Sequence, residues 1–142
     1  MVIVVFIFII CFLYYRLFYL YTVSWNSLPV NITHNTLDVA SVIVACRNEE
    51  NNVVRLIDDV KNQRFNKERF EMIVVDDHSE DKTLEILKKE EEKWSNLTVI
   101  SMNEMEEGKR NAIKKGISIA NGEIILCTDA DCRIGKNWIR TI

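Results

Sequence analysis

Residues 123–132 have the sequence EIILCTDADC, an apolar run followed by two aspartates, Asp129 and Asp131. The run predicts a buried β-strand over residues 123–127, which places both aspartates at the carboxyl end of that strand. Ligands of open α/β sheets bind at this edge, and carboxylate oxygens are ligands that hard divalent cations favour. We therefore expect a metal-and-phosphate site behind this strand.

Upstream of this stretch, strand and helix patterns alternate. Runs rich in β-branched residues predict strands over 40–46, 70–75 and 97–101. The apolar residues between the strands recur at helical spacing: Val53, Leu56, Ile57 and Val60; Leu84, Leu87 and Trp94; Ala112, Ile113, Gly116, Ile117 and Ala120. The alternation predicts an α/β fold with a mostly parallel sheet and helices on both faces.

Several residues mark the expected ends of these helices. Ser79 or Asp81 is expected to cap the second helix. Asn121 and Gly122 form a C-cap signal after the third helix. Trp138 and Ile139 are expected to begin a further helix.

The N-terminal segment has a different character. Residues 2–21 are apolar apart from Arg16, and about 20 such residues suffice to cross a bilayer. A signal peptide is the main alternative, but neither a basic n-region nor a small-residue cleavage site is evident. We expect a membrane anchor over 1–23, a polar linker with Pro29 over 24–38, and a soluble domain over 39–142. Arg16 favours a cytoplasmic domain.

Composition excludes some classes of protein. The chain has 142 residues, 48% of them hydrophobic and 27% charged, which suits one domain with a core. A net charge of −3 and the lack of a long Lys/Arg stripe argue against nucleic-acid binding. The four cysteines form no CxxC pair. Cys46 and Cys127 are expected to be small core residues of strands, which favours a reducing compartment.

Two earlier strand ends are also polar. Residues 45–50 could hold a base, a ribose or a phosphate, and the alternative is an ordinary loop in which Asn48 caps the next helix. Asp76 and Asp77 form a second acidic pair. Asp77 could accept hydrogen bonds from a nucleobase imide or a ribose, or could belong to a capped helix start. His78 is expected to be a loop residue.

Residues 108–111, Gly-Lys-Arg-Asn, precede a predicted helix. A small residue followed by Lys109 and Arg110 suits an anionic diphosphate, because two cations add to the helix dipole. The spacing is not that of a P-loop, and a solvated basic turn is the alternative. A divalent cation at Asp129 and Asp131 would stabilise the charge on a leaving nucleoside diphosphate.

Taken in order, these segments resemble the N-terminal, nucleotide-binding half of a family-2 glycosyltransferase. The resemblance lies in residues 41–49, 73–79, 108–112 and 122–131, and covers about residues 40–140. It implies a Rossmann-like GT-A fold, a nucleotide-sugar donor that is often UDP-linked, a glycan or lipid-linked acceptor, and Mg²⁺ or Mn²⁺. A membrane-anchored member would work on the cytoplasmic face.

The resemblance also implies a role for individual residues. Ala45 and Glu49 would lie against the nucleoside, and Asp77 would bind the base. Lys109 would approach the nucleotide or diphosphate. Asp129 would face the ribose or sugar and, together with Asp131, hold the metal.

Family members continue with an acceptor-binding half that supplies an acidic general base. The sequence ends at Ile142, so we expect these residues to bind the donor without that base. A catalytically inactive, membrane-anchored protein is therefore one alternative. A response-regulator receiver would need a later Thr/Ser and a Lys, and the aspartate motif of a haloacid-dehalogenase-type phosphatase normally opens its domain. A dinucleotide-binding module would need G-x-G-x-x-G, which is missing.

Overall fold

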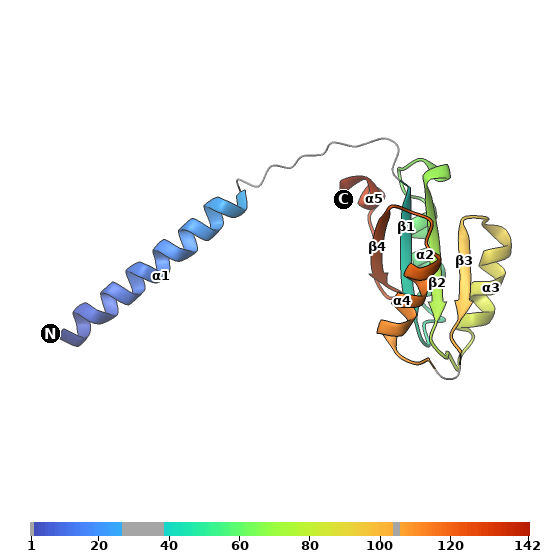
Figure 1. Cartoon of the computed structure of the whole chain (residues 1–142), viewed down its shortest axis with the longest axis horizontal. Helices are drawn as coiled ribbons and strands as arrows, with labels where there is room; N and C mark the ends of the chain where they lie inside the picture. Colours follow the sequence, from blue (N-terminus) through green and yellow to red (C-terminus); the bar gives the residue numbers. More distant parts are fainter. Residues whose placement is uncertain (1, 27–38, 104–105) are drawn as a thin grey trace. The chain divides into compact units, whose positions relative to one another are not determined.

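The computed structural model describes residues 2–26, 39–103 and 106–142, in two separate units (Figure 1). One unit contains helix α1 (Val2–Asn26). Its stretch Val4–Ser24 is long and apolar enough to cross a membrane, a criterion that a signal sequence also meets. Most of the expected linker, including Pro29, lies at 27–38, outside the described residues.

The second unit is built on four parallel strands, which confirms the predicted sheet. They are β1 (Ala40–Cys46), β2 (Phe70–Asp76), β3 (Leu97–Ser101) and β4 (Ile124–Asp129). Their order is β3-β2-β1-β4. This is the order of a Rossmann half-sheet and differs from the 2-1-3-4-5 order of receiver domains.

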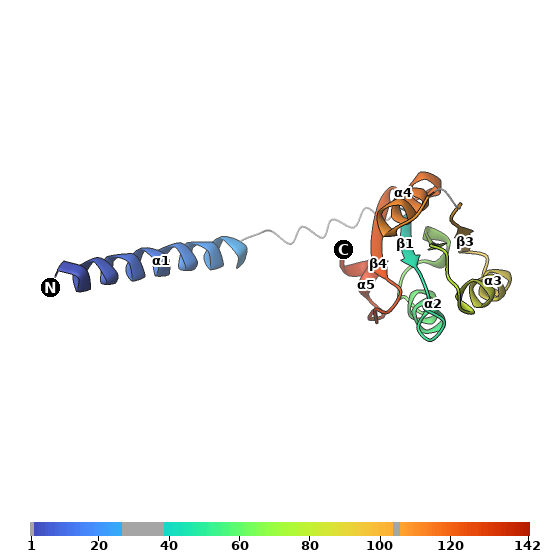
Figure 2. The ribbon, with the colours of Figure 1, turned by 90° about the horizontal axis from the view of Figure 1, so that it is seen from below.

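Helices cover both faces of this sheet (Figure 2). Helices α2 (Val53–Lys61) and α3 (Thr83–Lys93) lie on one face, and α4 (Lys109–Ile119) lies on the other. A short 3-10 turn, η1 (Lys67–Arg69), precedes β2, and the predicted last helix is confirmed as α5 (Trp138–Thr141).

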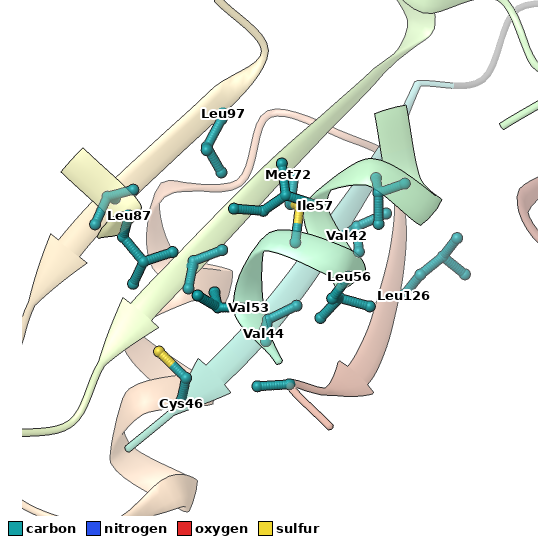
Figure 3. Packing of buried hydrophobic residues seen from close by; sticks show 14 of the residues in the cluster. Val42, Val44, Cys46, Val53, Leu56, Ile57, Met72, Leu87, Leu97 and Leu126 are labelled. Atoms are coloured by element: carbon teal, nitrogen blue, oxygen red, sulfur yellow. The ribbon is translucent and has the colours of Figure 1, made fainter. Parts of the chain in front are cut away.

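The larger core lies between the sheet and helices α2 and α3. Alternate residues of β1 point to this side, and α2 contributes the four apolar residues that its spacing predicted (Figure 3). The fully or almost fully buried residues of β1 and α2 in this cluster are Ala40, Val42, Val44, Cys46, Val53, Leu56, Ile57 and Val60. Burial of these apolar side chains is the main favourable contribution to packing α2 and α3 on the sheet.

On the opposite face, α4 approaches the sheet through small residues. Ala112 and Gly116 are its buried positions. A Cβ at Gly116 would lie only 2.6 Å from Cγ2 of Ile43 and 3.4 Å from Cγ2 of Val75. The absence of a side chain at Gly116 therefore sets how closely α4 packs on β1 and β2.

The prediction of a buried last strand is wrong in two respects. β4 runs to Asp129, so this aspartate belongs to the strand, and only Leu126 of its residues is buried. Ile125 is 36% exposed and Cys127 is also exposed, so Cys127 is not a core residue. The reason is position: in the sheet formed by the described residues β4 lies at one end, and α4 packs on β1 and β2.

Two predicted helix caps also need correction. The expected C-cap at Asn121 and Gly122 is wrong, because α4 ends at Ile119 with Ala120 as its C-cap. A glycine is needed at position 122 for a different reason: a Cβ there would lie 2.6 Å from the backbone nitrogen of Ser41. Asn48 does not cap α2, whose N-cap is Asn52. A third expectation, Ser79 or Asp81 as the cap of α3, is also wrong, because the N-cap of α3 is Lys82; Oδ1 of Asp81 nevertheless accepts the Thr83 N–H at 2.9 Å.

Candidate functional site

A pocket of about 230 Å³ lies at the carboxyl ends of β1 and β4. The strand order reverses between these two strands, and ligands of doubly wound sheets bind at such a switch point. All six residues that the sequence singled out line the pocket, together with Cys46, Arg47 and Ala130: Ala45, Glu49, Asp77, Lys109, Asp129 and Asp131. The fold thus brings every predicted site residue to one place.

The end of β1 supplies a neutral part of the lining. Ala45 is half-buried and pairs in register with Asp129, while Cys46 is buried. Burial, reinforced by the neighbouring carboxylate of Asp76, raises the pKa of the Cys46 thiol to about 12. Cys46 therefore stays protonated at neutral pH and adds no charge to the pocket.

Asp77 connects the end of β2 to the start of α4. Its two carboxylate oxygens lie 3.0 and 3.2 Å from the N–H of Gly108, and Oδ1 lies 3.0 Å from Nδ1 of His78. Asp77 is only 5% exposed. Gly108 has φ +100° and ψ 146°, a backbone conformation open essentially to glycine alone. The loop position of His78 agrees with the prediction, at a left-handed φ of 60°.

Lys109 follows Gly108 and reaches across to β4. Its Nζ lies 2.7 Å from Oδ1 of Asp129, and this hydrogen bond raises the pKa of Lys109. Within the described ranges, the exposed carboxylate of Asp131 has no such partner. The two aspartates of the predicted motif thus differ: one is paired and the other faces solvent.

Arg47 lines the pocket and lies in the predicted segment 45–50, but the sequence did not single it out as a site residue. Its Nη1 lies 2.7 Å from Oε1 of Glu107, and this hydrogen bond raises the pKa of the guanidinium. The available signal was its position directly after β1, at the same sheet edge as the predicted residues. Both pocket cations are therefore paired with carboxylates.

The loop that carries Glu49 is tied to the loop after β2. The Glu49 N–H donates to Thr83 Oγ1 at 2.8 Å, and the Asn48 N–H donates to Ser79 Oγ at 2.9 Å. In return, Oδ1 of Asn48, which has a left-handed φ of 58°, accepts the Glu80 N–H at 2.8 Å. These reciprocal bonds hold Glu49 in place without a ligand.

Asp129 at the end of β4 and Asp131 in the following turn supply only some of the ligands that a metal ion needs. In the parts of the chain that the structure describes, no group of three or more His, Cys, Asp or Glu residues could hold a metal ion by itself. Mg²⁺, however, is usually bound through one or two carboxylates together with substrate phosphates and water. Asp129 and Asp131 suit a cation that is shared with a diphosphate.

Comparison with known proteins identifies the class. Residues 41–142 match the family model described as glycosyl transferase family 2, so the chain belongs to this family. It is 31% identical over 105 residues to glycosyltransferase AglE of Haloferax volcanii, covering 74% of this chain and 34% of that protein. The membership favours the glycosyltransferase interpretation over the receiver, phosphatase and dinucleotide-binding alternatives.

Solved structures agree with the GT-A fold. Staphylococcus aureus TarS 1–349 in complex with UDP-GlcNAc is 36% identical, with a TM-score of 0.62, covering 72% of this chain and 29% of that one. Mannosyltransferase PcManGT of Pyrobaculum calidifontis, in complex with GDP-Man and Mn²⁺, is 27% identical with a TM-score of 0.71, covering 83% and 35%. This chain therefore spans about a third of the length of these proteins.

Proposed function

We propose that the strand-end pocket binds a nucleotide-sugar donor, with uridine as the base, for metal-assisted transfer of the sugar to a glycan or lipid-linked acceptor. The observation that carries this proposal is the convergence of Asp77, Lys109, Asp129 and Asp131 at the switch point of a family-2 domain. UDP-GlcNAc in TarS and GDP-Man in PcManGT support a nucleotide-sugar donor.

Each pocket residue takes a role that its position suits. Asp77 accepts the base N–H at Oδ2, which has a lone pair beyond the one that Gly108 uses, whereas Oδ1 is also in contact with His78. Ala45 and Glu49 lie against the nucleoside, and Lys109 binds the diphosphate. Asp129 faces the ribose or sugar and shares the metal with Asp131, which is the fully available ligand of the two.

The charges of the pocket support metal dependence. Two cations, Arg47 and Lys109, stand against four carboxylates among the lining residues: Glu49, Asp77, Asp129 and Asp131. An anionic diphosphate would be repelled by this excess of negative charge. A divalent cation supplies the missing positive charge and stabilises the nucleoside diphosphate as it leaves. Lys109 then exchanges its bond to Asp129 for one to the diphosphate.

We further propose that α1 anchors the protein in a membrane, with the domain of residues 39–142 on the cytoplasmic side. The support is the length and composition of Val4–Ser24 and the position of Arg16. A membrane location would also suit a lipid-linked acceptor.

Calorimetric titration of UDP into the detergent-solubilised chain, with and without Mn²⁺, tests donor binding once circular dichroism shows that the protein is folded. We expect binding that needs Mn²⁺ and that Asp131→Ala weakens at least about tenfold, as for loss of a charged ligand contact. Asp58→Ala, which removes an exposed carboxylate on α2, is the matched control and should bind normally.

Two results would contradict the proposal. One is a folded chain that binds neither UDP nor GDP in the presence of Mn²⁺. The other is UDP binding that Asp131→Ala leaves unchanged. Preference for GDP over UDP would overturn the uridine assignment and leave the remainder standing.

A further inference from the structure

Helix α4 carries an unusual set of charges for this protein. Its sequence, KRNAIKKGISI, contains four cations and no acidic residue. On α3, by contrast, Lys88, Lys89 and Lys93 each pair with a glutamate of the same helix, at 2.8, 2.6 and 2.7 Å. The basic side chains of α3 are thus neutralised locally, and those of α4 are not.

Three of the α4 cations have no partner in the protein as described. Lys109 is bonded to Asp129, but within residues 2–26, 39–103 and 106–142 the side chains of Arg110, Lys114 and Lys115 form no ion pair and no hydrogen bond. All three are exposed. An unpaired cluster of this kind is left available to an external anion.

The same side of the helix exposes an apolar residue. Ala112 and Gly116 face the sheet, so helical spacing puts Arg110, Lys114 and Ile117 on the opposite side. Ile117 is 46% exposed. Figure 2 shows α4 alone, among the labelled helices of the domain, on this face of the sheet. We call Arg110, Lys114 and Ile117, together with Lys115 on the flank of the helix, the α4 basic face.

We propose that the α4 basic face docks on a bilayer surface that contains anionic lipid. Lys and Arg on one side of a helix, next to an apolar side chain, are suited to the boundary between headgroups and acyl chains. The domain is covalently joined to α1, which has the length and composition of a membrane span. The net charge of −3 opposes capture of a free polyanion from solution, but not contact with a surface already in reach.

Docking would also orient the pocket. Lys109 is both the first residue of α4 and part of the pocket lining, so a bilayer along α4 would lie beside the pocket. If the proposed function holds, the donor would then sit at the level of the headgroups, within reach of a lipid-linked acceptor. The docking itself does not depend on donor binding and is testable without a nucleotide.

Lysine footprinting of the full chain in vesicles tests the proposal. The protein is inserted in vesicles of phosphatidylcholine alone or with phosphatidylserine, and a membrane-impermeant acetylating reagent is added. We expect acetylation of Lys114 and Lys115, read by mass spectrometry, to be about fivefold slower in the anionic vesicles. Molar salt should abolish the difference, because it screens charges beyond about 3 Å. Lys89 and Lys93 on α3 are internal controls and should not change.

A charge-reversal variant separates docking from a general effect of the vesicles. Arg110→Glu should restore labelling of Lys114 and Lys115 in anionic vesicles, whereas Lys82→Glu, at an exposed site before α3, should not. Equal labelling of wild-type protein in both kinds of vesicle would overturn the proposal. So would protection that arises in neutral vesicles on addition of an acidic protein or an oligonucleotide, which would assign the face to that partner.

Discussion

Asp59 on α2 holds Arg133, two residues beyond Asp131, through two hydrogen bonds. Nε of Arg133 lies 2.7 Å from Oδ2 of Asp59, and Nη2 lies 3.2 Å from Oδ1. The Ile134 N–H also donates to Oδ2, at 3.3 Å. The Arg133 side chain is largely exposed, so the pair contributes little to stability. Its effect is to fix the course of the chain just after the proposed metal ligands.

Asp59→Ala should therefore affect ligand binding more than folding. We expect the free energy of unfolding to fall by about 1 kcal/mol or less, while Mn²⁺-dependent UDP affinity falls several-fold because Asp131 is held less firmly. Urea denaturation and calorimetry measure the two quantities. The neighbouring exposed residue gives a matched control, Asp58→Ala, which should change neither. UDP affinity equal to that of wild type in Asp59→Ala would show that this clamp does not position Asp131.

Gly108→Ala tests the backbone conformation at the start of α4. A Cβ at Gly108 would meet no atom within 4 Å, so any cost arises from its φ of +100° rather than from a clash. We expect destabilisation of about 1–3 kcal/mol in urea unfolding, together with weaker UDP binding because the bond to Asp77 is disturbed. Gly135→Ala, which also has open space but no positive φ, should be nearly neutral. Equal effects of the two substitutions would contradict the argument.

Gly116→Ala tests the close approach of α4 to the sheet. Alanine is favoured over glycine in a helix by about 1 kcal/mol, but its Cβ would lie 2.6 Å from the buried Cγ2 of Ile43. Overpacking of this kind costs about 1–3 kcal/mol, so we expect a net loss of stability and a lower thermal midpoint. Ser118→Ala, on the exposed side of the same helix, is the control. A Gly116→Ala protein at least as stable as Ser118→Ala would mean that α4 shifts without cost.

Glu71 should make stability depend on pH. Its pKa lies below the ordinary value of 4.5: burial alone would raise it, but hydrogen bonds from Ser41 and Asn121 outweigh that effect. Since the folded-state pKa is depressed, the stabilisation is present above pH 4.5 and is lost as the pH falls through the lowered value. We expect Glu71→Gln to reduce the urea midpoint at pH 7 and to converge with wild type in acid. A constant difference from pH 7 to pH 3 would refute this.

The arrangement of strands and helices was predictable because their sequence periods differ and the connections are regular. The limits of β1 and β3 agree with the predicted 40–46 and 97–101. The grouping of Ala45, Asp77 and Asp129 was also predictable, since the carboxyl ends of parallel strands meet at one edge. These conclusions need only local patterns and one general property of parallel sheets.

Contacts between distant segments could not be obtained in this way. The Lys109–Asp129 and Arg47–Glu107 pairs join residues 20 and 60 positions apart, and their formation depends on strand order. Periodicity does not encode that order. The exposure of Cys127 could not be predicted for the same reason. The sequence of an apolar strand does not reveal whether the strand lies at the edge of a sheet or in its centre.

The central position of β1 has a consequence for hydrogen exchange. Among the residues that the structure describes, β1 is hydrogen-bonded to β2 on one side and to β4 on the other, whereas β4 pairs with β1 alone. Amides of such a central strand exchange only on extensive unfolding, and those of an edge strand exchange through smaller local openings. The pocket thus combines residues from a slowly opening strand, Ala45 and Cys46, with Asp129 from a more readily opening one. Binding of a nucleotide should consequently slow amide hydrogen exchange in β4 far more than in β1.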